Sequence, residues 1–392
     1  MTEMTLHQMQ IAVKRAIMWL TESGIQNQCE GRKRHGSFNA WYEKDSETYP
    51  FVYSEITGYL VTLMCYLYEK TQDEKFLRRA VMAGDWLLDA SYETNGWFRC
   101  LYPLSPSRFD FKQNQIYSFD NGVIVNSMVN LYRSTKQDKY LASAVTAADW
   151  LVFSAQKPSG AFFPGYLLDE GVFFESEDEW SMCSGSFHAK NAIGLLNLYD
   201  VTHKFDYLKA ATKVCDYALE CQDVSGRYVS FEARGGTNAH PHCYTAEGLW
   251  VAGTYLNKKE YLLSSARGVQ WLLDMQSEDG YIPRLYLDDV PIYSERVDAV
   301  SQTLRLAALH LDNKYLAEAY SGRAEILVPV IMNYQASDTD KRVDGGFYFG
   351  KTSSGELVWH VNSWVTAFAI QTLNMYSEYC RSNLALSPFL LV

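Results

Sequence analysis

One structural unit recurs about six times along this chain of 392 residues. Each copy joins a helical segment with a polar head to an amphipathic helical segment and contains a short turn of glycine and aromatic residues. The glycines of these turns lie 60, 64, 66, 54 and 66 residues apart: Gly36, Gly96, Gly160, Gly226, Gly280 and Gly346. A period of this length predicts a repeat architecture.

Aromatic residues mark the same repeat nine or ten residues before the glycine in four copies, at Trp86, Trp150, Tyr217 and Trp271. The first copy departs from this pattern because Trp19 lies 17 residues before its glycine, and the last copy lacks a tryptophan at the equivalent place. Terminal copies of a repeat often diverge in this way.

Two kinds of helical segment alternate through the repeat. Segments of the first kind are apolar on nearly every side, as expected of helices packed all round; they span residues 53–71, 119–135, 187–202, 243–256, 297–311 and 360–376. Segments of the second kind, such as 74–90 and 139–155, have apolar residues at helical spacing with charges between them. The first kind should form an inner ring and the second an outer ring.

An open array of six such hairpins would leave the apolar inner helices facing water. The pattern therefore predicts an all-α fold, an (α/α)6 toroid of six helical hairpins with short β-like turns. The repeat runs from about Leu6 to about Tyr379 without a linker or low-complexity tract. We expect one toroid domain over residues 1–392.

Composition excludes several classes of partner. The 35 basic and 46 acidic residues give a net charge of −11, and no basic run is interleaved with aromatic residues, so neither nucleic acid nor an anionic membrane is an expected partner. The sequence has no uncharged apolar stretch of 18 residues and no visible secretory signal. The eight cysteines are scattered without a CxxC pair, which is typical of reduced core residues in a cytoplasmic protein.

The polar residues of the inner segments should gather in space. In a toroid all inner helices run the same way, so their N-terminal ends meet at one mouth. The ionisable and amide residues in these heads are Tyr53, Ser54, Glu55, Asp120, Asn121, His188, Asn191, His242, Tyr244, Glu247, Asp298, Ser301, Gln302, His360, Asn362 and Ser363. Many of them are also ordinary helix-capping residues.

Two carboxylates and three histidines are the catalytic candidates. Glu247 lies in an apolar run about one turn inside its predicted helix, where burial should raise its pKa unless a His or Arg partner offsets the effect. Such a group suits proton transfer near neutral pH, and Asp120 would share the acid and base roles. His188, His242 and His360 fall at equivalent places around the ring and would orient hydroxyl or carboxylate groups.

Residues expected to bind substrate come from the same heads and from the glycine-aromatic turns. They are Tyr53, Glu55, Trp97, Arg99, Asn191, Tyr244, Asp298, Asn362 and Trp364, with Arg234 and Arg284 as further partners for an acidic group. The acidic insertion at residues 171–188 is a candidate lid. His240, His242 and Cys243 lie close together, but no second ligand cluster accompanies them, so we expect no metal and no cofactor.

The repeat and its polar heads resemble the six-hairpin glycosidase-like superfamily, whose members share the (α/α)6 toroid. Within it, SFDNGVIVNSMVNLYRSTKQDKYLASAVTAADWL, residues 118–151, resembles proteins of bacterial surface-polysaccharide gene clusters and the unsaturated glucuronyl hydrolases. In those hydrolases an inner-helix aspartate works as general acid and base, which implies that role for Asp120. No second matching aspartate is evident in this chain.

The placement of the histidines also resembles the N-acylglucosamine 2-epimerase family, which moves protons with inner-helix histidines and a nearby glutamate. His188, His242 with Glu247, and WHVNSW around His360 carry this resemblance. That family spaces its histidine and glutamate three residues apart, whereas His242 and Glu247 are five apart.

We therefore predict a carbohydrate-active enzyme, foremost a glycoside hydrolase acting on a bacterial glycan or a uronate-containing oligosaccharide. The first alternative is a sugar epimerase, isomerase or polysaccharide lyase that uses His or Tyr for proton transfer. The second is a glycan-binding toroid without catalysis. Fold alone does not choose among them.

Overall fold

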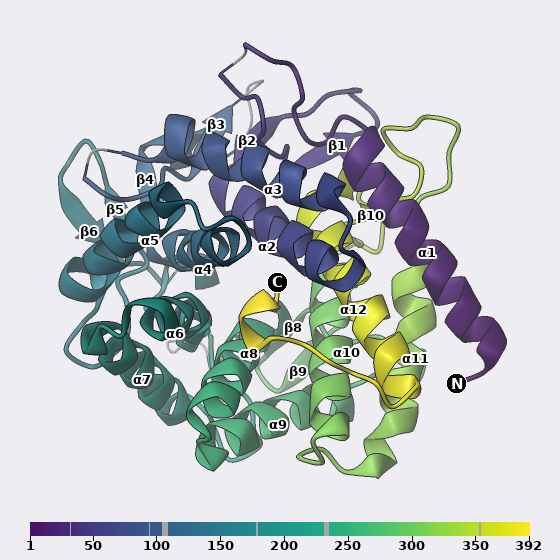
Figure 1. The fold of residues 1–392 in the computed structure, drawn as a ribbon. Helices are drawn as coiled ribbons and strands as arrows, with labels where there is room; N and C mark the ends of the chain where they lie inside the picture. Colours follow the sequence, from purple (N-terminus) through teal and green to yellow (C-terminus); the bar gives the residue numbers. More distant parts are fainter. Residues whose placement is uncertain (32, 94, 104–108, 178, 231–234, 353) are drawn as a thin grey trace.

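Two concentric rings of helices make up the fold (Figure 1). The computed structural model describes the whole chain apart from residues 32, 94, 104–108, 178, 231–234 and 353. The inner ring consists of α2 (Ser54–Thr71), α4 (Ser118–Thr135), α6 (Asn191–Thr202), α8 (Ala239–Leu256), α10 (Val297–Asp312) and α12 (Ser363–Cys380). The outer ring consists of α1 (Glu3–Glu22), α3 (Glu74–Trp86), α5 (Asp138–Trp150), α7 (Phe205–Glu220), α9 (Lys259–Asp274) and α11 (Ser321–Met332).

The inner ring is closed. Each inner helix packs against the next one around the ring, and α12 packs against α2 to complete the circle. The inner helices are buried on nearly every side, as their all-round apolar sequences predict. The predicted all-α (α/α)6 toroid is confirmed.

The glycine turns join neighbouring repeats. Gly36, Gly96, Gly160, Gly226 and Gly280 all have a positive φ, and an added Cβ would lie within 2.6 Å of an atom of the next outer helix. These positions therefore require glycine. In the last copy this role belongs to Gly345, whose φ is 92° and whose Cβ would meet the carbonyl of Arg15 in α1. The prediction of Gly346 was wrong by one residue, because two adjacent glycines obscured the register.

A glutamine side chain secures five of the six turns. In each case its amide donates to the carbonyl of the turn glycine and to a carbonyl of the next outer helix. The five residues are Gln26, Gln156, Gln222, Gln276 and Gln335. Because Gln335 donates to the helix that begins the chain, the same contact also closes the outer ring.

Short strands lie at the end of the toroid where the inner helices begin. One sheet contains β1 (Trp41–Glu43), β11 (His360–Asn362) and β10 (Phe347–Tyr348), and another pairs β2 (Phe51–Tyr53) with β3 (Leu101–Pro103). A third contains β4 (Gln115–Tyr117), β5 (Gly165–Leu167) and β6 (Val172–Phe174), and a fourth β7 (Thr237–Asn238), β8 (Leu285–Leu287) and β9 (Val290–Ile292). Because β2, β4, β7 and β11 run directly into inner helices, they place those helix N-termini around one mouth.

The chain after α12 crosses the ring, and its end lies near the centre (Figure 1). Phe389, Leu390, Leu391 and Val392 are all buried there. Asn126 and Asn130 of α4 donate to the carbonyl of Phe389, and Lys190 donates to a main-chain oxygen of Val392. Polar side chains of α4 and of the residue before α6 thus satisfy part of this segment's backbone. No helix in the described part of the chain has the length and apolarity needed to cross a membrane.

Candidate active site

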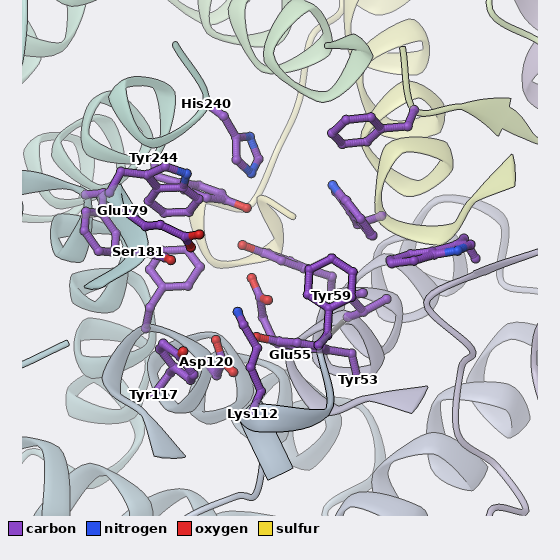
Figure 2. A pocket seen from close by; sticks show the side chains of 18 of the residues that line it. Tyr53, Glu55, Tyr59, Lys112, Tyr117, Asp120, Glu179, Ser181, His240 and Tyr244 are labelled. Atoms are coloured by element: carbon purple, nitrogen blue, oxygen red, sulfur yellow. The ribbon is translucent and has the colours of Figure 1, made fainter. Parts of the chain in front are cut away.

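A cavity of about 300 Å³ lies at the mouth where the inner helices begin (Figure 2). First turns of inner helices, the short strands and two loop segments supply its walls. The polar residues that line it are Tyr53, Glu55, Tyr59, Lys112, Tyr117, Asp120, Glu179, Ser181, His240, Tyr244, Arg296 and His360. The remaining lining is chiefly aromatic: Trp41, Phe51, Phe109, Phe119, Trp180, Phe187, Phe349 and Trp364.

Glu55 and Asp120 form a carboxyl pair in this cavity. Glu55 is the second residue of α2 and Asp120 the third of α4, and Figure 2 shows both side chains beside Lys112. Burial raises the pKa of Asp120 to about 6. Burial, and then the negative charge of Asp120, raises the pKa of Glu55 well above its usual range. Burial and mutual repulsion therefore make it harder for both carboxyl groups to be ionised at once, and the two groups titrate as a pair.

Lys112 supplies a positive charge beside this pair. It comes from the 3-10 helix Asp110–Asn114, and its ammonium lies 4.7 Å from the ring centroid of Tyr117 and 5.7 Å from that of Tyr53. Its charge opposes the rise in the pKa of both carboxyl groups. Among the described residues no carboxylate lies within ion-pair distance of the Lys112 ammonium, which leaves it available to an acidic group.

Aromatic rings form one wall of the cavity. The ring of Trp41 is stacked on that of His360 with centroids 4.6 Å apart, and Trp364 approaches Trp41 edge-on at 6.1 Å. Phe349 lies 5.4 Å from His360 on another side. Flat apolar surfaces of this kind suit the C–H faces of a sugar ring, while the hydroxyl groups need polar partners.

Asp298 positions two cavity residues from behind. It accepts hydrogen bonds from the Arg296 guanidinium at 3.1 and 2.6 Å and from the indole of Trp364 at 3.1 Å. The positive charge of Arg296, together with the hydrogen bonds from Arg296 and Trp364, holds the pKa of Asp298 below its usual value despite burial. Asp298 itself does not line the cavity. It therefore holds Arg296 and Trp364 in place through hydrogen bonds and does not itself face the ligand.

His240 also faces the cavity (Figure 2). It is the second residue of α8, and its Nδ1 lies 2.7 Å from the side-chain oxygen of Gln302. Burial lowers the pKa of His240 to about 4, so its ring is neutral at pH 7.

Six of the predicted site residues line this cavity: Tyr53, Glu55, Asp120, Tyr244, His360 and Trp364. They come from α2, α4, α8 and α12 and from the strands before them. Their chemical roles remain predictions.

Glu247 does not line the cavity. It is completely buried, and it accepts hydrogen bonds from Lys190 at 2.6 Å and from the Arg305 Nε at 2.9 Å. These two cations more than offset desolvation and lower the pKa of Glu247. The predicted Arg partner is thus present, and Glu247 lies behind the cavity wall instead of at the mouth where it was expected.

His188 and His242 are wall residues of the core. The Nδ1 of His188 lies 3.2 Å from the carbonyl oxygen of Gly185, and its ring contacts Phe187. His242 accepts a hydrogen bond from the backbone of Tyr228 and donates one to the carbonyl of Gly268. Burial lowers the pKa of His188 to about 3 and that of His242 to about 4.

Other predicted binding residues also lie away from the cavity. Trp97 packs edge-on against Trp150, and Arg99 pairs with Glu93 at 2.8 Å. Asn191 is buried against Ser118, and Asn362 caps α12 by accepting from the backbone of Val365. Arg284 donates to a backbone carbonyl, and Arg234 lies outside the described residues.

The periodic pattern did not indicate several cavity residues. Lys112 lies in an irregular loop, and Glu179 and Trp180 belong to the acidic insertion, whose role as a lid remains a prediction. Arg296 directly precedes α10, so reading each inner-helix head one residue further upstream would have found it. Within the described ranges no three His, Cys, Asp or Glu side chains come together as metal ligands do.

No protein-family model and no curated protein sequence matches this chain. Solved structures do match its fold. A cellobiose 2-epimerase from Bacillus thermoamylovorans has a TM-score of 0.77 at 11% identity and covers 95% of this chain and 100% of its own. A sugar epimerase from a ruminal bacterium has a TM-score of 0.78 at 9% identity, covering 96% and 98%.

The unsaturated glucuronyl hydrolase of a Bacillus species is also similar, with a TM-score of 0.66 at 15% identity, covering 93% of this chain and 96% of its own. At such identities these likenesses establish the fold alone. The chain thus shares the (α/α)6 toroid fold of these solved structures.

Proposed function

We propose that the protein is a carbohydrate-active enzyme that hydrolyses glycosidic bonds in a bacterial glycan or a uronate-containing oligosaccharide. The observation that carries this proposal is the carboxyl pair of Glu55 and Asp120 in an aromatic cavity. Two carboxyl groups that share a site and hold one proton between them provide an acid and a base at neutral pH.

In this scheme Glu55 is the general acid. It gives its proton to the leaving glycosidic oxygen as the bond from that oxygen to the anomeric carbon breaks. Asp120 is ionised and either removes a proton from the attacking water or bonds to the anomeric carbon before water replaces it. The overall reaction adds one water to the glycosidic bond and regenerates both carboxyl groups.

The positive charge of Lys112 supports a uronate as the sugar at this site. Its ammonium projects into the cavity beside Glu55 and Asp120, and it has no carboxylate partner of its own among the described residues. Arg296 is a second cation on the wall, although Asp298 already neutralises it. A carboxylate on the substrate would pair with Lys112.

Mass spectrometry in H₂¹⁸O tests the proposal. A panel of uronate-containing and amino-sugar oligosaccharides is incubated with the protein, and hydrolysis should give cleaved products that carry one ¹⁸O. Glu55→Gln and Asp120→Asn should each reduce this rate by about 10²-fold or more. Cleavage that persists at the original rate in both variants would refute the assignment.

Matched controls are available on the outer ring. Glu74 and Asp138 lie in the first turns of α3 and α5, as Glu55 and Asp120 do in α2 and α4, but they are remote from the cavity. Glu74→Gln and Asp138→Asn should leave the rate unchanged.

Sugar epimerisation or isomerisation is the second candidate, because two histidines, His240 and His360, line the same cavity. A neutral His240 could remove a proton α to a carbonyl group, and a second group could return it on the other face. This reaction leaves the sugar's mass unchanged in ordinary water. Incorporation of deuterium from ²H₂O into an uncleaved sugar would favour it over hydrolysis.

A further inference from the structure

A line of hydrogen bonds connects the buried centre of the toroid to the cavity. The Nε2 of Gln302 donates to Glu247 at 3.3 Å, and the Oε1 of Gln302 lies 2.7 Å from the Nδ1 of His240. Glu247 and Gln302 are completely buried, and His240 is 4% exposed. Three residues from two inner helices, α8 and α10, thus form one buried polar chain.

The orientation of Gln302 follows from its partner. Glu247 accepts hydrogen bonds from Lys190 and Arg305, and these two cations keep it ionised. An ionised carboxylate only accepts hydrogen bonds, so Gln302 must turn its NH₂ group toward Glu247. The side-chain oxygen of Gln302 then faces His240, and the Nδ1 of His240 must carry the hydrogen.

Asp298 reinforces the same arrangement. Its Oδ2 lies 3.6 Å from the Nδ1 of His240, beyond hydrogen-bond distance, and already accepts from Arg296 and Trp364. Its negative charge attracts an N–H group and repels a nitrogen lone pair. It therefore favours the tautomer in which Nδ1, the ring nitrogen nearer to Asp298, carries the hydrogen. Burial lowers the pKa of His240 to about 4, so at pH 7 the ring carries only that one hydrogen.

The other ring nitrogen faces the ligand space. The His240 ring points into the cavity (Figure 2), and among the described residues Nε2 has no hydrogen-bond partner. We infer that Glu247 and Gln302 fix His240 in the tautomer with hydrogen on Nδ1, so that Nε2 accepts a hydrogen bond from a sugar hydroxyl group. His240 touches the ligand, and Gln302 and Glu247 are positioning residues. The sugar as ligand rests on the proposed function, whereas the tautomer does not.

Nitrogen NMR measures the tautomer directly. The full chain is labelled with ¹⁵N-histidine at pH 7.5, and the signals of His240 are identified as those lost in His240→Gln. We expect a protonated shift for Nδ1 and an unprotonated shift for Nε2. A hydrogen on Nε2, or rapid averaging between the two nitrogens, overturns the inference. This measurement uses the unaltered protein and no substrate, so it stands whether or not the proposed function holds.

Two variants test the positioning role. Gln302→Met keeps the length of the side chain but removes its acceptor, and His240 should then populate both tautomers. Thr303→Val changes the next buried residue of α10, which bonds to the carbonyl of Ala299 and not to His240, and should preserve the wild-type NMR pattern. An unaltered tautomer in Gln302→Met would show that Gln302 does not set it.

The second readout is kcat/KM of the two variants, measured with the oligosaccharide that the protein cleaves in the H₂¹⁸O assay. Gln302→Met should lower kcat/KM by about tenfold, the effect of one lost hydrogen bond to the ligand, while Thr303→Val leaves it unchanged. An equal loss in both variants would assign the effect to core packing and overturn the positioning role. If no oligosaccharide is cleaved, the proposed function fails, and the tautomer is still decided by NMR.

Discussion

Glu55 and Asp120 lie in the first turns of two neighbouring inner helices, and both carboxyl groups face the same cavity. A helix N-terminus favours an ionised carboxylate by about 0.3–1 kcal/mol. Burial opposes it, and the rise in the pKa of Asp120 from 3.8 to about 6 corresponds to roughly 3 kcal/mol. Desolvation therefore outweighs the helix dipole at this site, and a proton can be retained near neutral pH.

The dependence of activity on pH should follow this pair. If Asp120 must be ionised, kcat/KM falls as the pH drops through about 6. If Glu55 must be protonated, activity falls again at higher pH. Because the charge of Lys112 lowers the pKa of both groups, Lys112→Met should move both limbs of the profile to higher pH.

Initial rates measured at regular intervals from about pH 4 to about pH 10, so that both limbs are covered, check this expectation. Lys204 is the control, since it also lies over a tyrosine ring but is exposed at the start of α7. Lys204→Met should leave the profile in place. A shift of the acidic limb to lower pH in Lys112→Met would contradict the assignment.

The ion pairs of Glu247 should matter for stability. Glu247→Gln removes the buried charge that offsets Lys190 and Arg305, and we expect a loss of about 3–5 kcal/mol in the free energy of unfolding. The matched control is Glu93→Gln, which breaks the half-exposed pair with Arg99 and should cost about 0–1 kcal/mol.

Urea denaturation followed by circular dichroism measures both values. Equal losses in the two variants would mean that the buried cluster around Glu247 contributes no more than a surface ion pair.

The position of Glu247 also shows where sequence periodicity fails. The apolar pattern placed the start of this inner helix near Cys243, whereas α8 begins at Ala239. Pro241 obscured the start, although proline is tolerated in a first turn because its missing N–H would have no helical partner there. Glu247 is therefore eight residues into the helix, about 12 Å below its start. The predicted segment that contains Asp120 begins at residue 119 and α4 at Ser118, so the position of Asp120 in the first turn, at the cavity, agrees with the prediction.

Loop residues in the cavity were beyond the reach of the same pattern. The helical repeat predicts which helices are inner and which ends gather, and this placed Glu55, Tyr244 and His360 at the mouth. Lys112 and Glu179 come from irregular segments whose path depends on tertiary contacts. Periodicity carries no information about such residues.

The close approach of α4 and α6 yields the last prediction. A Cβ at Gly122 would lie 2.1 Å from the Oδ1 of Asn191 and 2.9 Å from its Cβ, and both residues are buried between the two helices. Gly322, in the first turn of α11, has no atom within 4 Å of an added Cβ. Both glycines lie in helices, so the two positions differ mainly in the space available.

Alanine favours a helix over glycine by up to about 1 kcal/mol, so Gly322→Ala should raise the free energy of unfolding by roughly 0.5–1 kcal/mol. At Gly122 overpacking outweighs this gain in helix propensity. Gly122→Ala should therefore lower the free energy of unfolding by about 1–3 kcal/mol. Urea denaturation of the two variants measures the contrast. If Gly122→Ala is as stable as Gly322→Ala, the inner helices are not packed as closely as their glycines imply.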